Sequence, residues 1–237
     1  DSGKLVNLAA DKNRDAVFYS IAGDNVSTGL YRDDWDKLFQ YGGRTFANRP
    51  LMPVLGNHDR QDGLGAQLYY DLFSLPENGP AAVEPEASYS FEYGNALFIM
   101  IDATSDVDDH TAWIEEKLKN TGATWKFVMF HFPPYNFEEP YLDIQQKWVP
   151  LFDKYHVDMV MGGHIHYYMR SRPMFNGKVV DSYEKGTVYA ISISIPNKHD
   201  SMVGEPYAVK QYDEGYFYQR MEIDGNVLKY TTVDSNG

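Results

Sequence analysis

Short apolar runs alternate with amphipathic stretches along most of this chain of 237 residues. The apolar runs have the length and composition of strands, and they cover residues 16–21, 51–55, 96–101, 126–130, 157–161 and 187–195. The stretches between them repeat apolar residues at helical spacing and predict helices over residues 33–48, 109–120 and 142–155. We expect Asp108 or Asp109 to cap the second of these helices. This alternation indicates a layered α/β domain.

The last third of the chain has a different pattern, in which strands follow one another directly. Strands are predicted over residues 179–189, 216–223 and 227–233. Asp224-Gly225-Asn226 separates the last two and is typical of a tight hairpin turn. Residues 74–85 and 196–206, which are rich in turn-forming residues, are predicted to be surface loops.

The composition excludes several classes of function. Hydrophobic residues make up 43% of the chain, as in globular proteins, and no apolar run is long enough to span a membrane. A net charge of −13 repels duplex nucleic acid. The chain has no cysteine, so disulfides, thiolate zinc sites and cysteine nucleophiles are excluded. The acidic composition with 19 tyrosines favours an exported protein, periplasmic or extracellular, and the sequence does not indicate an oligomeric state.

Polar side chains that can bind metals follow four of the predicted strands. These groups are Gly23-Asp24, Gly56-Asn57-His58-Asp59, His131 and Gly162-Gly163-His164-Ile165-His166. Ligands bind at the carboxyl ends of strands in open α/β sheets, so the four groups predict a common metal site. Oxygen and imidazole ligands without sulfur suit Mn, Zn, Fe or Ni. If the His-x-His segment is extended, its two side chains point to opposite sides and could serve two different ions.

The ordered set Gly-Asp, Gly-Asn-His-Asp, Val128-x-x-His131 and Gly163-His164-x-His166 resembles the calcineurin-like metallophosphoesterase superfamily. Three further segments resemble its purple-acid-phosphatase-like branch, namely His131-Phe132-Pro133-Pro134-Tyr135, Tyr89-Ser90-Phe91-x-Tyr93-Gly94-Asn95-Ala96 and Gly186-Thr187-Val188-Tyr189. The resemblance covers nearly the whole chain. It implies a four-layer α/β/β/α sandwich of two mixed β-sheets flanked by helices, with residues 1–237 in a single domain.

The same resemblance implies a site for two divalent metal ions. Asp24 would bridge the two metals through its carboxylate. Asn57, His131 and His164 would complete the shell of one metal, and His166 would belong to the other. The identity of the metals is left open.

The resemblance also implies catalytic roles for the residues beside Asn57. His58 would lie near the leaving-group oxygen and, with Asn57, contact the substrate. Asp59 would either orient His58 or cap the following turn. The implied reaction is hydrolysis of a small phosphate mono- or diester by a metal-activated hydroxide.

One motif of the family has no match in this chain, an Asp-x-His or Asp-x-Asp that ends an earlier strand. Only Asp1, Asp11 and Asp15 lie upstream of the Gly-Asp pair, and none of them follows an apolar strand. We therefore expect a domain truncated at its N-terminus, in which the metal site of His166 is half built. The resemblance implies two divalent metal ions, and binding of only one in this chain is the alternative that the half-built site leaves open. Ser27 stands where the purple enzymes carry a tyrosine, so a ferric–tyrosinate centre is not implied.

Two other functions are compatible with the sequence. The chain could be a catalytically impaired fragment or pseudoenzyme that binds at most one metal and acts as a binding module. It could also be a mononuclear hydrolase of another kind of ester. His110 and His199 are left out of the site, because His110 belongs to an acidic helix start and His199 to the loop over residues 196–206.

Overall fold

The computed structural model describes residues 2–61, 63–196 and 198–237, so Asp1, the first of the upstream aspartates, lies outside it. The helices are α1 (Ser2–Lys12), α2 (Arg32–Phe46), α3 (Gln67–Leu72), α4 (Val107–Asn120), α5 (Leu142–Lys147) and α6 (Val149–Tyr155), with a short 3₁₀ turn, η1, at Tyr183–Lys185. None of the helices described is long and apolar enough to cross a membrane.

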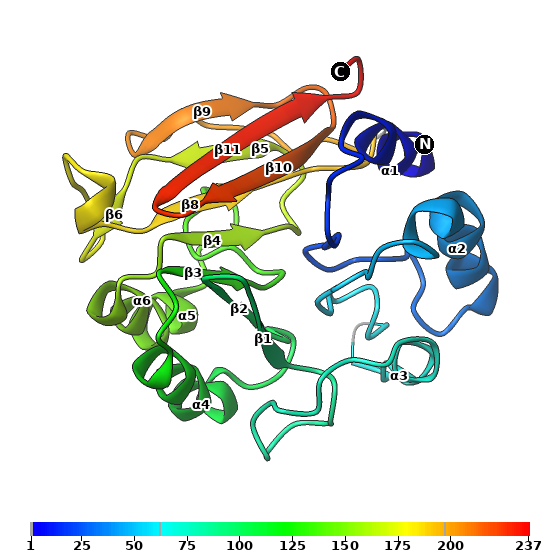
Figure 1. Ribbon diagram of the computed structural model, residues 1–237, viewed down its shortest axis with the longest axis horizontal. Helices are drawn as coiled ribbons and strands as arrows, with labels where there is room; N and C mark the ends of the chain where they lie inside the picture. The colour runs from blue at the N-terminus through cyan, green and yellow to red at the C-terminus, as the bar shows by residue number, and fades with distance from the viewer. Residues whose placement is uncertain (1, 62, 197) are drawn as a thin grey trace.

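In the part of the chain that the structure describes, seven strands form one mixed sheet in the order β1-β2-β3-β4-β8-β5-β9 (Figure 1). Their bounds are β1 (Tyr89–Tyr93), β2 (Ala96–Met100), β3 (Trp125–Met129), β4 (Met159–Gly162), β5 (Tyr168–Ser171), β8 (Val188–Ile191) and β9 (Ala208–Tyr212). Strands β2, β3, β4 and β8 are parallel, whereas β1 and β5 are antiparallel to their neighbours. The carboxyl ends of the four parallel strands therefore lie at one edge of the sheet.

Two antiparallel hairpins complete the strands. The larger pairs β10 (Phe217–Asp224) with β11 (Val227–Asp234), and the smaller pairs β6 (Met174–Phe175) with β7 (Lys178–Val179). Asp224 lies opposite Val227, so the turn between β10 and β11 is the predicted one, and Gly225 provides the positive φ of 57° that it requires.

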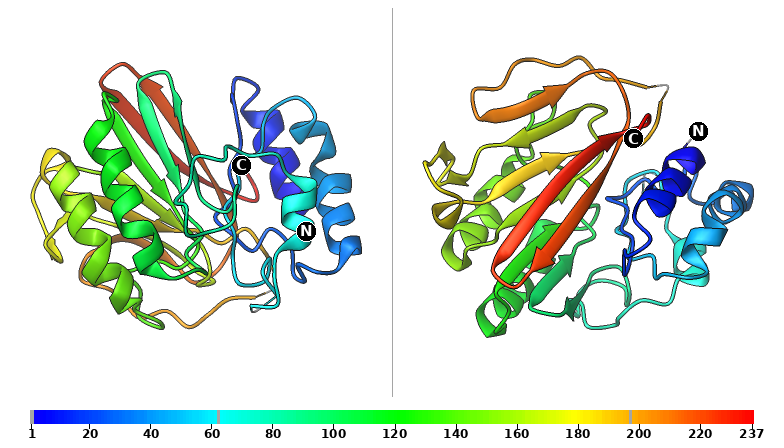
Figure 2. Two further views of the ribbon diagram at one scale, coloured as in Figure 1. Left: turned by 90° about the horizontal axis from the view of Figure 1, so that it is seen from below. Right: turned by 45° about the horizontal axis from the view of Figure 1, so that its top comes forward.

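Both faces of the large sheet are covered, which explains why every residue of β2 is buried. Leu97 and Ile99 pack with residues of α4, α5 and α6, whereas Phe98 and Met100 belong to a second core on the opposite face. That second core receives apolar side chains of the β10–β11 hairpin and of α2 and α3. Figure 2 shows the resulting layers, with α4 to α6 on one side and α1 to α3 on the other. The expected α/β/β/α arrangement is confirmed.

The second β layer is smaller than the sequence predicts, because residues 16–21 and 51–55 are extended but share only one bridge, Tyr19 with Leu51. The amides of Met52 and Val54 donate to the first segment, and Pro53 between them has no N–H for a further strand. Buried tyrosine hydroxyls occupy its carbonyl instead, from Tyr69 (3.2 Å) and Tyr89 (2.7 Å).

Two predicted elements are interrupted by local chemistry. The helix expected over residues 142–155 breaks at Trp148, because Pro150 near the start of α6 cannot donate to the preceding turn. The strand expected over residues 179–189 contains the turn η1 and resumes only as β8.

The expected cap of α4, Asp108 or Asp109, is also wrong, by two or three residues. The helix begins at Val107, and Asp106 caps it by accepting a hydrogen bond from the amide of Asp108 (2.9 Å).

A buried ion pair anchors the segment after residues 51–55 to the carboxyl end of β2. The Arg60 guanidinium lies 2.6 Å from the Asp102 carboxylate, whose side chain has no exposed surface. Asp102 also accepts hydrogen bonds from Thr104 and Ser105. The loop that contains Asn57 and His58 is therefore fixed to the large sheet at the carboxyl end of β2.

Because removal of Asp102 leaves Arg60, within the described part of the chain, with only the exposed carboxylate of Glu84 (3.3 Å) as an ionic partner, we predict that Asp102→Ala lowers the free energy of unfolding by about 3–5 kcal/mol. Urea denaturation followed by tryptophan fluorescence measures this change. The control is Asp36→Ala, which removes an exposed pair with Arg32 and should change stability little. Equal effects of the two substitutions would contradict a structural role for the buried pair.

Candidate metal centre

Glycine residues allow the loops of the site to approach one another closely. Gly23 and Asp24 both have positive φ angles, 84° and 51°, which turn the chain sharply after the first extended segment. A Cβ on Gly23 would collide with the His131 ring, and one on Gly56 would collide with the Asp24 carboxylate. The loops after residues 21 and 55 and the loop after β3 can therefore meet only with glycine at these positions.

His131 brings three electron-rich atoms together. It is buried, its Nδ1 lies 2.7 Å from the carbonyl oxygen of Ala22, and its Nε2 lies 3.1 Å from Asp24 Oδ2 and 3.2 Å from Asn57 Oδ1. When Nδ1 carries the proton and donates a hydrogen bond to the Ala22 carbonyl, the lone pair of Nε2 faces the oxygens of Asp24 and Asn57. Such a convergence is stabilised by a cation, and a backbone carbonyl on the other ring nitrogen is the usual support of a metal-binding histidine.

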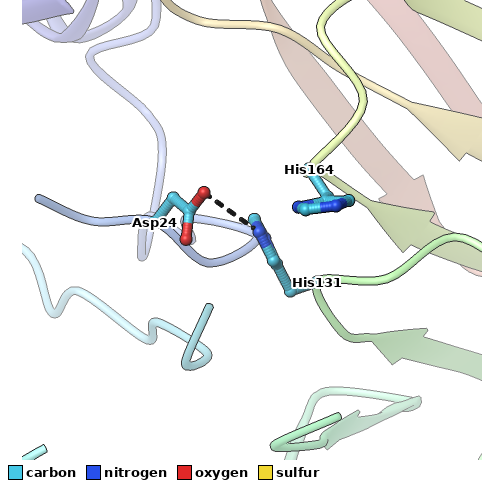
Figure 3. A group of neighbouring side chains, drawn as sticks. All are labelled: Asp24, His131 and His164. Carbon is cyan, nitrogen blue, oxygen red and sulfur yellow. Dashed lines mark ion pairs between the residues drawn. The ribbon is translucent and has the colours of Figure 1, made fainter. Parts of the chain in front are cut away.

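His164 joins the same group from the loop after β4. The side-chain ligand atoms of Asp24, His131 and His164 all lie within 4.8 Å of one another (Figure 3). The ring of His164 packs edge-on against Phe132, with 4.8 Å between centroids, and its Nε2 lies 2.9 Å from Glu139 Oε2. Burial lowers the pKa of His164, which favours the neutral imidazole that a metal requires.

Burial would raise the pKa of Asp24, but the His131 contact and the backbone N–H of His58 lower it overall. This carboxylate is therefore ionised at neutral pH. An ionised carboxylate at the meeting point of two imidazoles is a suitable ligand for a divalent cation.

His166 lies in the same pocket but outside the group of three. The pocket has a volume of about 150 Å³ and is lined by Asp24, His58, Glu138, Glu139, His164, Ile165, His166, Lys198 and Asp200. His166 Nδ1 lies 3.2 Å from Asp200 Oδ2, and burial lowers the pKa of His166. The structure thus brings Asp24, Asn57, His131 and His164 together and places His166 beside an aspartate.

His58 reaches the pocket with its ring half exposed. Its amide donates to Asp24 Oδ1 (3.0 Å), its Nδ1 lies 3.0 Å from the carbonyl oxygen of Ser27, and its Nε2 lies 4.0 Å from Asp24 Oδ2. The orientation of this ring is therefore set by Ser27, and Nε2 is the nitrogen nearer to Asp24.

Asp59 lies beneath the pocket and is fully buried. Among the described residues, its carboxylate accepts hydrogen bonds from the amides of Gly56, Asn25 and Val26 and from the side chain of Asn25. Asp59 thus joins the Asp24 loop to the Asn57 loop and contacts the backbone rather than the His58 ring.

Four charged residues of the pocket were not found from the sequence, namely Glu138, Glu139, Lys198 and Asp200. They lie in irregular segments that carry neither periodicity nor a motif. Of the histidines left out, His110 is buried against Ser88 (2.9 Å), and His199 contacts the carbonyl oxygen of Gly215 (2.9 Å).

The profile of the calcineurin-like phosphoesterase family matches residues 1–168, more than half of the chain. The chain belongs to this family. An uncharacterized protein of Mycobacterium tuberculosis is 28% identical over 188 residues, which cover 68% of this chain and 34% of that protein. The Fe(3+)-Zn(2+) purple acid phosphatase 12 of Arabidopsis thaliana is 26% identical over 161 residues, covering 60% and 34%. The chain thus spans about a third of the length of these relatives.

The fold is also shared with solved structures. A purple acid phosphatase from yellow lupin (Lupinus luteus) seeds matches with a TM-score of 0.84 at 16% identity, over 99% of this chain and 47% of that one. At this identity the similarity shows the fold alone. It agrees with the layers and the mixed sheet described above.

Asp59 makes the stability of the fold depend on pH. Burial raises its pKa to about 6, although the N–H donors around it act in the opposite direction. Because this pKa exceeds the unfolded value of about 4, the folded state binds the proton more tightly. The resulting stabilisation is complete below about pH 4 and is lost as the pH rises through 6.

We predict that Asp59→Asn, which cannot titrate, lacks this decline, which amounts to at most about 3 kcal/mol. The free energy of unfolding of both proteins, measured in urea with a chelator present at intervals from pH 4 to pH 7, tests this. Parallel curves for the two proteins would show that Asp59 is already ionised throughout the range.

Proposed function

We propose that this chain hydrolyses phosphate esters at a metal centre held by Asp24, Asn57, His131 and His164. The convergence of carboxylate, amide and imidazole atoms around Nε2 of His131 is the observation that carries the proposal. Membership of the calcineurin-like phosphoesterase family supports it.

The donor atoms fit divalent metals of the first transition row. One carboxylate, one amide oxygen and two imidazoles without sulfur suit Mn, Zn, Fe or Ni. Such cations, when bound, polarise phosphoryl oxygens and lower the pKa of water. The Arabidopsis relative is named as an Fe(3+)-Zn(2+) enzyme, and this name supports a centre with two metals.

The roles of the protein groups follow from their positions around the pocket. Asn57 binds as a neutral amide, which leaves a cation more electrophilic than a further carboxylate would. The Ser27 carbonyl accepts from Nδ1 of His58, so the neutral ring presents the lone pair of Nε2 to the pocket, and the doubly protonated ring would donate a proton from Nε2 to a leaving-group oxygen. Asp59 supports the loop of Asn57 and His58 by accepting hydrogen bonds from the backbone amides of Gly56 and Val26.

A second candidate is a chain that binds one metal and acts as a binding module. It is favoured by the group of three ligands around Asp24, which does not include His166 among the described residues. A hydrolase of carboxylic esters is a third candidate, and it differs in its substrate.

We predict that His131→Ala and His164→Ala each reduce the metal-dependent hydrolysis of 4-nitrophenyl phosphate to the background rate, because each removes an imidazole next to Asp24. Release of nitrophenolate, measured after incubation of the metal-free chain with Mn²⁺ or Zn²⁺, gives the rate. Bis(4-nitrophenyl) phosphate and 4-nitrophenyl acetate, assayed in parallel, distinguish diesterase and carboxylesterase activity.

The matched control is His156→Asn, at the left-handed residue that directly follows α6, a conformation that asparagine tolerates. This variant should retain the rate of the unmodified chain. Full activity of both alanine variants would overturn the assignment of the centre.

We further predict that the unmodified chain retains close to two equivalents of metal after desalting, measured by mass spectrometry. Two equivalents require that His166 and its neighbours hold the second ion. A single equivalent would support the binding-module candidate over the dinuclear enzyme.

A further inference from the structure

Each imidazole of the His-x-His pair has a carboxylate beside one of its ring nitrogens. Nε2 of His164 lies 2.9 Å from Glu139 Oε2, and Nδ1 of His166 lies 3.2 Å from Asp200 Oδ2. The two carboxylates come from different loops, one after β3 and one before β9. They meet different nitrogens, so the two rings would be held in opposite tautomers.

We propose that Glu139 and Asp200 are positioning residues that fix these tautomers, so that His164 offers Nδ1 and His166 offers Nε2 to metal ions. The inference rests on the proposed function and extends it to residues outside the motifs. A ring nitrogen that donates its N–H to a carboxylate leaves the lone pair on the other nitrogen. Carboxylates in this position also make the imidazole a stronger ligand.

Glu139 is held in place independently of His164. The Tyr141 hydroxyl donates to the same carboxylate oxygen, Oε2, at 2.6 Å. The buried Asn136 accepts from the amide of Glu139 (2.6 Å) and donates to its carbonyl oxygen (2.7 Å). The ring of Tyr141 stacks on Phe132, which packs against the ring of His164. The carboxylate is therefore preorganised, although its side chain is about half exposed.

Asp200 is fixed to His166 by the backbone of both residues. Its Oδ2 accepts from the amide of His166 (2.7 Å), and its own amide donates to the carbonyl oxygen of His166 (3.1 Å). These bonds hold the loop before β9 against the His-x-His segment. The contact with Nδ1 is a close approach without the alignment of a full hydrogen bond, so a small rotation of the ring would complete it.

Glu138 provides a matched control in the same pocket. It adjoins Glu139 and carries the same charge. Within the described residues, the hydrogen bonds and ion pairs of both imidazoles involve Glu139 and Asp200 and not Glu138. Loss of its carboxylate therefore changes the charge of the pocket without changing either tautomer.

The test is a metal titration of the metal-free chain with Co²⁺ and Zn²⁺, giving the dissociation constant, the number of ions bound and the visible absorption of the Co²⁺ form. We expect Glu139→Ala and Asp200→Ala to keep the number of ions and weaken binding by about 10–100-fold. Glu139→Gln and Asp200→Asn keep an acceptor oxygen and should recover part of this loss. Glu138→Ala, which removes the same charge without a contact to either ring, should weaken binding less than the other two alanine variants.

Thermal unfolding of the metal-free proteins separates positioning from folding, and the amide variants serve if an alanine variant fails to fold. Affinities equal to that of Glu138→Ala, or the loss of one bound ion, would overturn the positioning role, since a lost ion would mark a direct ligand. If the unmodified chain binds no metal, the proposed function fails and this inference fails with it.

Discussion

Two loops that are far apart in the sequence meet at one buried carboxylate, that of Asp59. Burial of an ionised group costs free energy unless N–H donors replace the lost water. The donors are backbone amides of Gly56, Asn25 and Val26, so the carboxylate holds two loop backbones at once. Asp24 directly precedes Asn25, and its place in the centre follows from this contact. The close approach of the loops in turn requires glycine at positions such as Gly56.

The other half of the centre is placed by the large sheet. Because β3 and β4 are parallel neighbours, the residues that follow them emerge at the same edge, and His131 and His164 lie with 5.0 Å between their ring centroids. The candidate metal centre therefore lies where the carboxyl edge of one β layer meets the loops of the other. The buried pair of Arg60 with Asp102 joins these two halves, since it fixes the Asn57 loop to the end of β2.

The sequence predicted those parts of the fold whose signals are local. Residues 96–101 and the final hairpin were recognised because their apolar pattern and turn residues can be read from neighbouring positions in the sequence. Residues 16–21 and 51–55 were predicted as strands, but they share only one bridge, and buried tyrosine hydroxyls take the place of a neighbouring strand at Pro53. Glu139 and Asp200 could not be found, since only the tertiary structure brings them to the two imidazoles.

The charges of the pocket restrict the order of events in the proposed phosphoesterase. Among the described residues, four carboxylates, from Asp24, Glu138, Glu139 and Asp200, line it together with one ammonium, that of Lys198. Two like unit charges 4 Å apart repel by about 4 kcal/mol at an effective dielectric constant of about 20, so a phosphate ester is repelled from the bare pocket. Divalent cations reverse the local field. In the proposed reaction, metal binding must therefore precede substrate binding. A carboxylate that strengthens metal binding favours the anionic substrate only through the cation that it helps to hold.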